Sequence, residues 1–263
     1  MTDSPGMVVR IGTSGWQYRE WRGAFYPAGL AQGRWLEHYA RTFDTVESNN
    51  AFYRLPERRT FEQWAARTPD DFVMAVKASR YLTHVRRLRD AAEPVERLVD
   101  RAGGLGAKLG PILLQLPPRF RADAERLDAT LAAFPAGWRI AVEVRDASWE
   151  HDEIRSVLEA RGAALCLADR RGPLRPRWRT TGWTYLRFHE GTAVPRPCYG
   201  ERALTTWARR LHEGWGPDAE AWVYFNNDPG ACAPRNAVTF ARLCERAGMR
   251  VGRATPPDRD GFA

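Results

Sequence analysis

The 263-residue sequence is poor in cysteine, and its apolar runs are short. Its four cysteines, Cys166, Cys198, Cys232 and Cys244, are widely spaced without a C-x-x-C pair, which disfavours a zinc site and a dense disulfide framework. We therefore expect reduced thiols and a cytoplasmic protein. No stretch approaches the roughly 18 apolar residues of a membrane span, and the opening residues MTDSPGM show no basic-then-apolar leader. We expect a soluble chain with no membrane partner.

Lysine is also rare, because only Lys77 and Lys108 stand among the 40 basic residues and the rest are arginine. The formal net charge of +8 attracts anions, nucleic acid included. The arginines are nevertheless scattered, without the basic block that marks a nucleic-acid tail. This distribution favours a solvated arginine-rich surface over a dedicated nucleic-acid patch.

Short apolar runs recur along the whole chain, each followed by polar or turn residues. Eight of them have the length of strands, at 8–13, 45–49, 72–78, 110–116, 139–145, 164–169, 183–189 and 220–227. Segments with helical spacing lie between most of them, at 34–43, 58–67, 92–102, 123–134, 152–161, 201–212 and 235–247. The repeated strand-then-helix order, in a chain close to the roughly 250 residues of one barrel, predicts a single (β/α)8 TIM-type barrel over residues 1–263.

Three segments need separate interpretation. The sixth unit, 170–182, is rich in proline and arginine, and we expect an irregular connection there with only a short turn of helix. Loops 14–33 and 190–200 have the length of lids or binding loops. Trp16, Tyr18 and Tyr26 of the first loop would either stack on a sugar or base or pack a lid on the rim. No G-x-G-x-x-G follows the first run, which disfavours an open dinucleotide-binding sheet.

Alternation along the runs separates two faces of the predicted sheet. In 139–145 the apolar residues Ile140, Val142 and Val144 hold the even positions, whereas Glu143 and Arg145 hold odd ones. The run 183–189 repeats this pattern. We expect the apolar parity to face the helices and the polar parity to point inside the barrel.

Polar residues of the inner parity come late in their runs and therefore gather at the carboxyl ends of the strands, the catalytic face of barrels. They are Lys77, Gln115, Glu143, Arg145, Arg187 and His189, with Glu47 and Asn49 in the second run. Burial of unpaired charge is unfavourable, so these groups must pair or meet a ligand at the mouth. A purely structural salt-bridge ring, such as Glu143 with Arg187, is the alternative to a functional site.

Lys77 and two histidines are the strongest candidates for chemistry. Lysine at this point indicates a compact, titratable amine in a chain that otherwise uses arginine. His189 shares a face with Arg187, and His84 lies in the mouth loop 79–84, where a group titrating near neutrality can move protons. Asp169 ends the sixth run and Asn226, Asn227 and Asp228 end the eighth, as ligands or as helix caps.

A divalent metal would find ligands in Glu47, Glu143, Asp169 and His189. The neighbouring cations, Lys77, Arg145 and Arg187, would repel it and would attract a phosphate or a carboxylate instead. This charge distribution disfavours a divalent metal without excluding one, and we expect no other cofactor.

Seven strings in chain order resemble the YecE-like family, a domain of unknown function: IGTSGWQYREWRGAFYP, VESNNAFYRLP, VKASRYLTH, LGPILLQLPPRF, VEVRDASW, LRFHEG and YFNNDPGACAPRNA. The resemblance runs from about residue 10 to residue 250. It implies a β/α barrel of the xylose isomerase and endonuclease IV type, and it implies no particular reaction. Its motifs fall on the mouth residues named above and add Phe52, Tyr53, Thr83 and Trp149.

We expect an enzyme with hydrolase- or lyase-type acid/base chemistry on a small anionic substrate, with Lys77, Glu143 and His189 as catalytic residues. The substrate-binding residues would be Trp16, Glu47, Asn49, His84, Gln115, Arg145, Asp169, Arg187 and Asn226. One alternative is a nucleic-acid-binding or phosphodiester-cleaving barrel similar to endonuclease IV. Another is a non-catalytic ligand sensor or scaffold, since one fold hosts unrelated functions.

Overall fold

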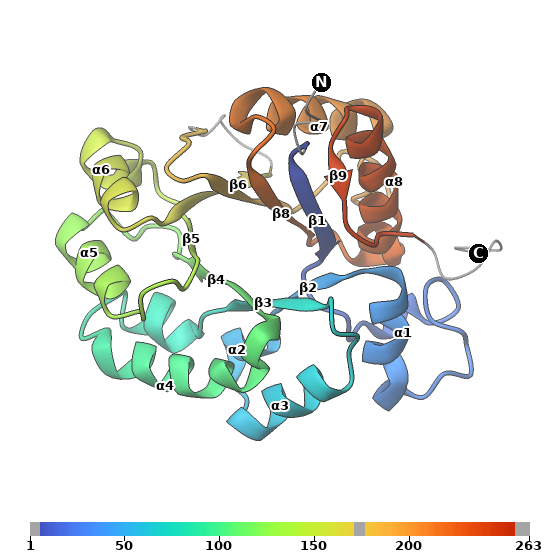
Figure 1. The fold of residues 1–263 in the computed structure, drawn as a ribbon, viewed down its shortest axis with the longest axis horizontal. Helices are drawn as coiled ribbons and strands as arrows, with labels where there is room; N and C mark the ends of the chain where they lie inside the picture. The colour runs from blue at the N-terminus through green and yellow to red at the C-terminus, as the bar shows by residue number, and fades with distance from the viewer. Residues whose placement is uncertain (1–5, 171–176, 256–263) are drawn as a thin grey trace.

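Nine parallel strands form one curled sheet in the computed structural model, which describes residues 6–170 and 177–255 (Figure 1). The strands are β1 (Val8–Thr13), β2 (Thr45–Ser48), β3 (Val73–Lys77), β4 (Leu109–Gln115), β5 (Ile140–Glu143), β6 (Ala164–Asp169), β7 (Trp183–Phe188), β8 (Glu220–Phe225) and β9 (Arg250–Val251). They lie in the order β2-β3-β4-β5-β6-β7-β8-β1-β9. Most crossovers therefore join neighbouring strands, as repeated βαβ units require.

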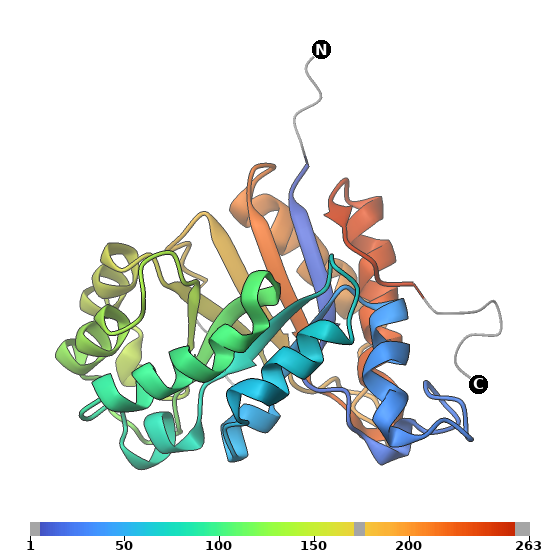
Figure 2. The same ribbon diagram turned by 60° about the horizontal axis from the view of Figure 1, so that its bottom comes forward.

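The helices lie on the outer side of the curled sheet (Figures 1 and 2). They are α1 (Trp35–Thr42), α2 (Asn50–Tyr53), α3 (Arg58–Ala66), α4 (Ala92–Ala102), α5 (Ala124–Ala132), α6 (Asp152–Ala160), α7 (Glu201–Trp215) and α8 (Cys232–Arg246). Shorter helical segments are Arg19–Trp21, Gln32–Arg34, Tyr81–Val85, Gly103–Lys108, Ala147–Trp149 and Pro229–Ala231. Within residues 6–170 and 177–255, none of these helices has the length and apolar character needed to cross a membrane.

The predicted α/β class and the alternation of strand and helix are confirmed. The two-residue strand β9, which pairs with β1, was not predicted, because so short a strand leaves no apolar run. Residues 177–182 of the sixth unit contain no helix, and residues 171–176 of that unit lie outside the described part of the chain.

The ladder of the sheet is interrupted between β1 and β2, where the predicted barrel would close. An isolated bridge between Ser14 and Glu47 joins the two chain segments. The hydroxyl of Tyr39 accepts a hydrogen bond from the amide of Thr13 (2.9 Å) and donates one to the carbonyl of Thr45 (3.0 Å). A tyrosine hydroxyl thus takes the place of ladder hydrogen bonds at this edge of the curled sheet.

The two faces of the sheet separate as the alternation predicts. Ile140 and Val142 belong to the core between sheet and helices, whereas Ala141 belongs to a second cluster inside the sheet. This inner cluster comprises Ala75, Leu113, Ala141, Ala164, Cys166, Tyr185, Trp222 and Tyr224. The inside of the sheet is therefore filled by side chains, as in barrels, and they form a floor beneath the polar residues at the carboxyl ends.

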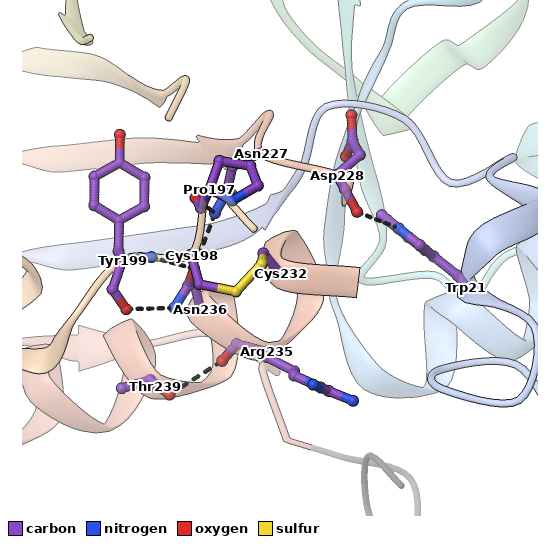
Figure 3. Close-up of a disulfide and its surroundings, with 10 residues drawn as sticks. All are labelled: Trp21, Pro197, Cys198, Tyr199, Asn227, Asp228, Cys232, Arg235, Asn236 and Thr239. Carbon is purple, nitrogen blue, oxygen red and sulfur yellow. Dashed lines mark hydrogen bonds between the residues drawn. A yellow bond between two sulfur atoms is a disulfide. The ribbon is translucent and has the colours of Figure 1, made fainter. Parts of the chain in front are cut away.

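The expectation of reduced thiols is wrong for two of the four cysteines. Cys198 and Cys232 form a disulfide, with Cα atoms 5.0 Å apart across 34 residues of sequence (Figure 3). The loop 190–200 folds back on the start of α8, where the side chain of Asn236 bonds both the amide (2.9 Å) and the carbonyl (3.0 Å) of Tyr199. Sequence spacing could not show this contact, because it depends on the path of the loop. Cys166 and Cys244 are free and buried.

Candidate functional site

A buried ion-pair network lies at the carboxyl ends of the strands on the inner face of the sheet. The Arg187 guanidinium bridges two carboxylates, with its nitrogens 2.6 Å from Glu143 Oε2 and 2.8 Å from Glu47 Oε1. The hydroxyl of Tyr185 donates to the other oxygen of Glu47 (2.7 Å). All three charged side chains are buried, so the net charge of the triad stays inside the protein.

Three further groups converge on Oε1 of Glu143. The side-chain amide of Gln115 donates to it at 2.9 Å, Arg145 Nε donates at 3.1 Å, and His189 Nε2 lies 3.3 Å away. Burial would raise the pKa of Glu143, but the charge of Arg187 and the contacts with His189 and Arg145 hold this pKa well below its usual value. Glu143 therefore stays ionised at neutral pH, and the geometry suits it to positioning its neighbours better than to exchanging protons.

A cavity of about 380 Å³ opens above this network, a volume in the range of small-molecule sites. Its walls come from the ends of β1, β2, β3 and β8 and the segments that follow them. They are Gly15, Trp16, Gln17, Tyr18, Asn49, Asn50, Tyr53, Lys77, Asn226 and Asp228. The predicted residues Trp16, Asn49, Lys77 and Asn226 are thus brought together, whereas Glu47, Gln115, Glu143 and Arg187 lie in or beside the network rather than in the wall.

Lys77 is the cation of the pocket wall, and it is 8% exposed. Its ammonium lies 4.0 Å from the centre of the Phe52 ring, a cation–π contact. Among residues 6–170 and 177–255 it has no hydrogen bond or ion pair. Burial and the nearby charge of Arg187 lower the pKa of Lys77 to about 8, against the opposing effect of Glu47 and Glu143.

Asp228 is an acidic group of the same wall that the sequence left undecided between a ligand and a cap. Burial raises the pKa of Asp228 to about 7, although Tyr18 opposes the shift. Its Oδ1 is buried without a hydrogen-bond partner in the described chain. The indole of Trp21 donates to its backbone carbonyl (3.4 Å) and holds this segment in place (Figure 3). In the sequence, the only sign of this residue was the polar run that follows the eighth strand. Alternation alone does not determine which face of the sheet the residues of that run take.

His84 lies beside the pocket rather than in its wall. Its ring stands edge-on to Phe52 with 5.0 Å between centroids, and its Nδ1 is 2.9 Å from the Thr83 hydroxyl. Burial, followed by the charges of Lys77, Arg80, Arg145 and Arg87, lowers the pKa of His84 to about 4. The histidine is thus neutral at physiological pH. The four neighbouring cations make the electrostatic potential positive at this side of the mouth.

His189 links the network to the pocket wall. Its Nδ1 lies 3.2 Å from the side-chain amide of Asn226, and its Nε2 faces Glu143. Burial lowers the pKa of His189, and the neighbouring Glu143 carboxylate only partly offsets this effect.

Asp169 is the predicted ligand that the structure places elsewhere. Strand β6 turns Cys166 inward and Leu167 toward the helices, so Asp169 takes the outer parity. The Tyr199 hydroxyl donates to the backbone carbonyl of Asp169 (3.2 Å), and burial raises the pKa of the Asp169 carboxyl. Within the described residues, no group of three or more His, Cys, Asp or Glu side chains is arranged to hold a metal ion.

The fold and this pocket define a class: an α/β protein whose parallel strands present their carboxyl ends to a cavity. The family model described as "Protein of unknown function DUF72" matches residues 10–260, and the chain belongs to this family. The YecE-like resemblance is thereby confirmed.

Two curated relatives and one solved structure are similar to the chain. UPF0759 protein YecE of Escherichia coli strain K12 is 28% identical over 170 residues, which span 62% of this chain and only 60% of YecE. UPF0759 protein YunF of Bacillus subtilis strain 168 is 24% identical and is covered to 95%, with 90% of this chain. A DUF72 family protein of Thermotoga maritima MSB8 has 28% identity and a TM-score of 0.79, with 90% of this chain and 99% of that one covered.

Proposed function

We propose that the pocket binds a small anionic substrate, bearing a phosphate or carboxylate, and that the protein is an enzyme with lyase- or hydrolase-type acid/base chemistry. The observation that carries this proposal is the Lys77 amine, which lines the pocket without an ionic partner in the described chain. An anion entering the pocket would supply that partner.

The surrounding charges support an anionic ligand. Burial lowers the pKa of His84 first, and the charges of Lys77, Arg80, Arg145 and Arg87 lower it further. The side chain of Arg145 is 25% exposed and uses its Nε for Glu143, so its guanidinium is a partly exposed cation beside the network. Arg187, by contrast, is occupied by two carboxylates and acts as a positioning residue.

Acid/base chemistry requires groups that change protonation near neutral pH. Lys77, with a pKa of about 8, and Asp228, with a pKa of about 7, line the same cavity and meet this requirement. His189 reaches the cavity through Asn226 and remains a candidate proton carrier, whereas the low pKa of Glu143 favours a positioning role.

The test is calorimetric titration of a panel of phosphorylated and carboxylated metabolites into the wild type and Lys77→Gln. The control, Arg209→Gln, removes an equal charge from the exposed face of α7. We expect Lys77→Gln to weaken anion binding by about tenfold or more and the control to leave it unchanged. Equal affinities in all three proteins would remove the proposal. Binding without any turnover would instead support the sensor alternative.

The segments that follow β2 and β3 at the mouth support the alternative of nucleic-acid binding. Tyr53 is 81% exposed, Tyr81 is 46% exposed, and the Arg86 guanidinium lies 5.9 Å from the centre of the Tyr81 ring. Exposed aromatic rings and arginines are the groups on which single-stranded bases stack. Oligonucleotide affinity should then fall steeply with salt concentration, and salt-insensitive binding would exclude this alternative.

The curled sheet is proposed to act as a closed eight-stranded barrel around this site. The support is the close approach of β1 and β2: a Cβ atom at Gly12 would stand 2.2 Å from the carbonyl oxygen of Thr45. Only glycine permits this contact.

A further inference from the structure

We propose that Lys77 forms a covalent imine with the carbonyl group of its substrate, an anionic aldehyde or ketone, because its amine faces the pocket on an aromatic ring with no polar partner in the described chain. This inference rests on the proposed function and adds a role for the amine. A lysine held by an ion pair would lack a free electron pair. The anionic group of the substrate would then face Arg145 and the positive field of the mouth.

The amine must lose its proton before it can attack a carbonyl carbon. Burial and the charge of Arg187 bring the pKa of Lys77 to about 8, so about half of the amines are neutral at pH 8. An arginine could not serve, since its guanidinium stays protonated in proteins. This explains why a lysine stands at the end of β3 in a chain that has one other lysine, Lys108.

Asp228 is the group of the same cavity that can supply the proton. The nitrogen lone pair of Lys77 forms a C–N bond as the carbonyl π pair moves to oxygen, which takes a proton from the protonated carboxyl of Asp228. The nitrogen returns one proton to the carboxylate, giving a neutral carbinolamine. A second proton transfer to the hydroxyl then expels water and leaves a protonated imine. The step needs no oxidant or reductant, and the pKa of Asp228, about 7, keeps both of its forms populated at neutral pH.

The protonated imine withdraws electrons from the adjacent carbon bonds, which is the requirement for carbon–carbon cleavage or enolisation. Its positive charge replaces that of the lysine ammonium at the same place, so the electrostatic balance with Glu47 and Glu143 is retained. Lys77 would thus carry the lyase-type chemistry of the proposed function.

The experiment is reductive trapping with cyanoborohydride, followed by peptide mass mapping. The anionic probes are pyruvate, glyoxylate and dihydroxyacetone phosphate, and methyl pyruvate is the neutral match of pyruvate. With only two lysines in the chain, adducts at Lys77 and Lys108 are resolved directly. We expect at least one anionic probe to modify Lys77 about tenfold or more faster than Lys108.

Variants of the two lysines test whether the adduct depends on the Lys77 amine. Lys77→Arg keeps the charge and should abolish the adduct, whereas Lys108→Arg should leave it unchanged; Lys108 bonds the carbonyls of Ala65 and Thr68 (both 2.7 Å), away from the pocket. Asp228→Asn should slow the trapping at saturating probe concentrations, where a change in probe affinity has no effect on the rate.

Equal modification of both lysines, or no Lys77 adduct with any anionic probe, would overturn the imine. If calorimetry still showed Lys77-dependent anion binding, the proposed function would stand alone. If methyl pyruvate were trapped as fast as pyruvate, the imine would stand and the anionic substrate would be lost.

Discussion

At the scale of single residues, Arg187 decides the stability of the inner face. Its guanidinium bridges Glu47 and Glu143, and all three side chains are almost completely buried. Removal of one member leaves buried charge without compensation, whereas replacement of the whole set by neutral groups does not.

Arg187→Met should therefore lower the free energy of unfolding by about 3–5 kcal/mol, measured by urea denaturation. The triple variant Glu47→Gln, Glu143→Gln, Arg187→Met should recover most of this loss. A single variant as stable as the wild type would show that the ion pairs do not form.

Asp228 gives a pH dependence of defined sign. Its folded-state pKa of about 7 lies above the ordinary value of 3.8, so the folded state binds more protons between these values and this group lowers stability as pH rises through them. Asp228→Asn removes the effect. We expect the stability gained by the variant to grow by about 2–3 kcal/mol from about pH 5 to about pH 8 in urea melts. A constant difference would contradict the burial of an ionisable Asp228.

Alternation predicted that Lys77, Glu143, Arg187 and His189 would meet on one face. It could not predict that Glu143, Arg187 and His189 would join the buried ion-pair network while Lys77 would line the pocket, because this division depends on distances of a few ångströms. Glu143 and Arg187 were predicted as a catalytic and an anion-binding residue, respectively, and the structure shows them bonded to each other.

At the scale of elements, the loop 190–200 is fastened to α8 at several points. Besides the disulfide, the side-chain amide of Asn227 donates to the backbone carbonyl of Pro197 (3.0 Å) (Figure 3). Asn227 directly precedes Asp228 of the pocket wall. The length of the loop predicted a lid or binding loop, but its path, and hence the cysteine pair, could not be read from spacing. The parity of Asp169 stayed open for a similar reason, since the polar end of β6 does not reveal which face its last residue takes.

The double variant Cys198→Ser, Cys232→Ser should lose about 3–4 kcal/mol of stability, from the chain entropy of a loop closed across 34 residues. Amide exchange should accelerate in 190–200 and remain slow in β7. Wild-type protein in a thiol reductant is the control and should behave like the variant. Unchanged exchange after reduction would show that the hydrogen bonds alone fasten the loop.

At the scale of the whole molecule, the regular alternation of strand and helix was sufficient to predict a parallel α/β sheet, and its closure into an eight-stranded barrel stays a prediction. The sequence did not reveal the weak edge between β1 and β2, because a tyrosine hydroxyl from α1 enters the ladder there. Gly12 is the residue on which this edge depends.

Gly12→Ala would place a methyl group against the Thr45 carbonyl and should lower the free energy of unfolding by about 2–3 kcal/mol, since overpacking at a rigid contact is unfavourable. Gly29→Ala is the matched control, because a Cβ atom there meets open space. If both variants had the same stability in urea, β1 and β2 would not approach as closely as described.

The proposed function and the imine depend on one property of Lys77: within the described part of the chain its amine lines the pocket without an ionic partner, and burial makes it readily deprotonated. Its most direct test is competitive amine acetylation across pH, with the Lys77 and Lys108 peptides quantified separately by mass spectrometry. The structure predicts that Lys77 reacts with a midpoint near pH 8, well below the ordinary lysine pKa of 10.5. A midpoint for Lys77 near 10.5, or complete protection at all pH values, would show that the pocket does not hold an accessible amine of lowered pKa.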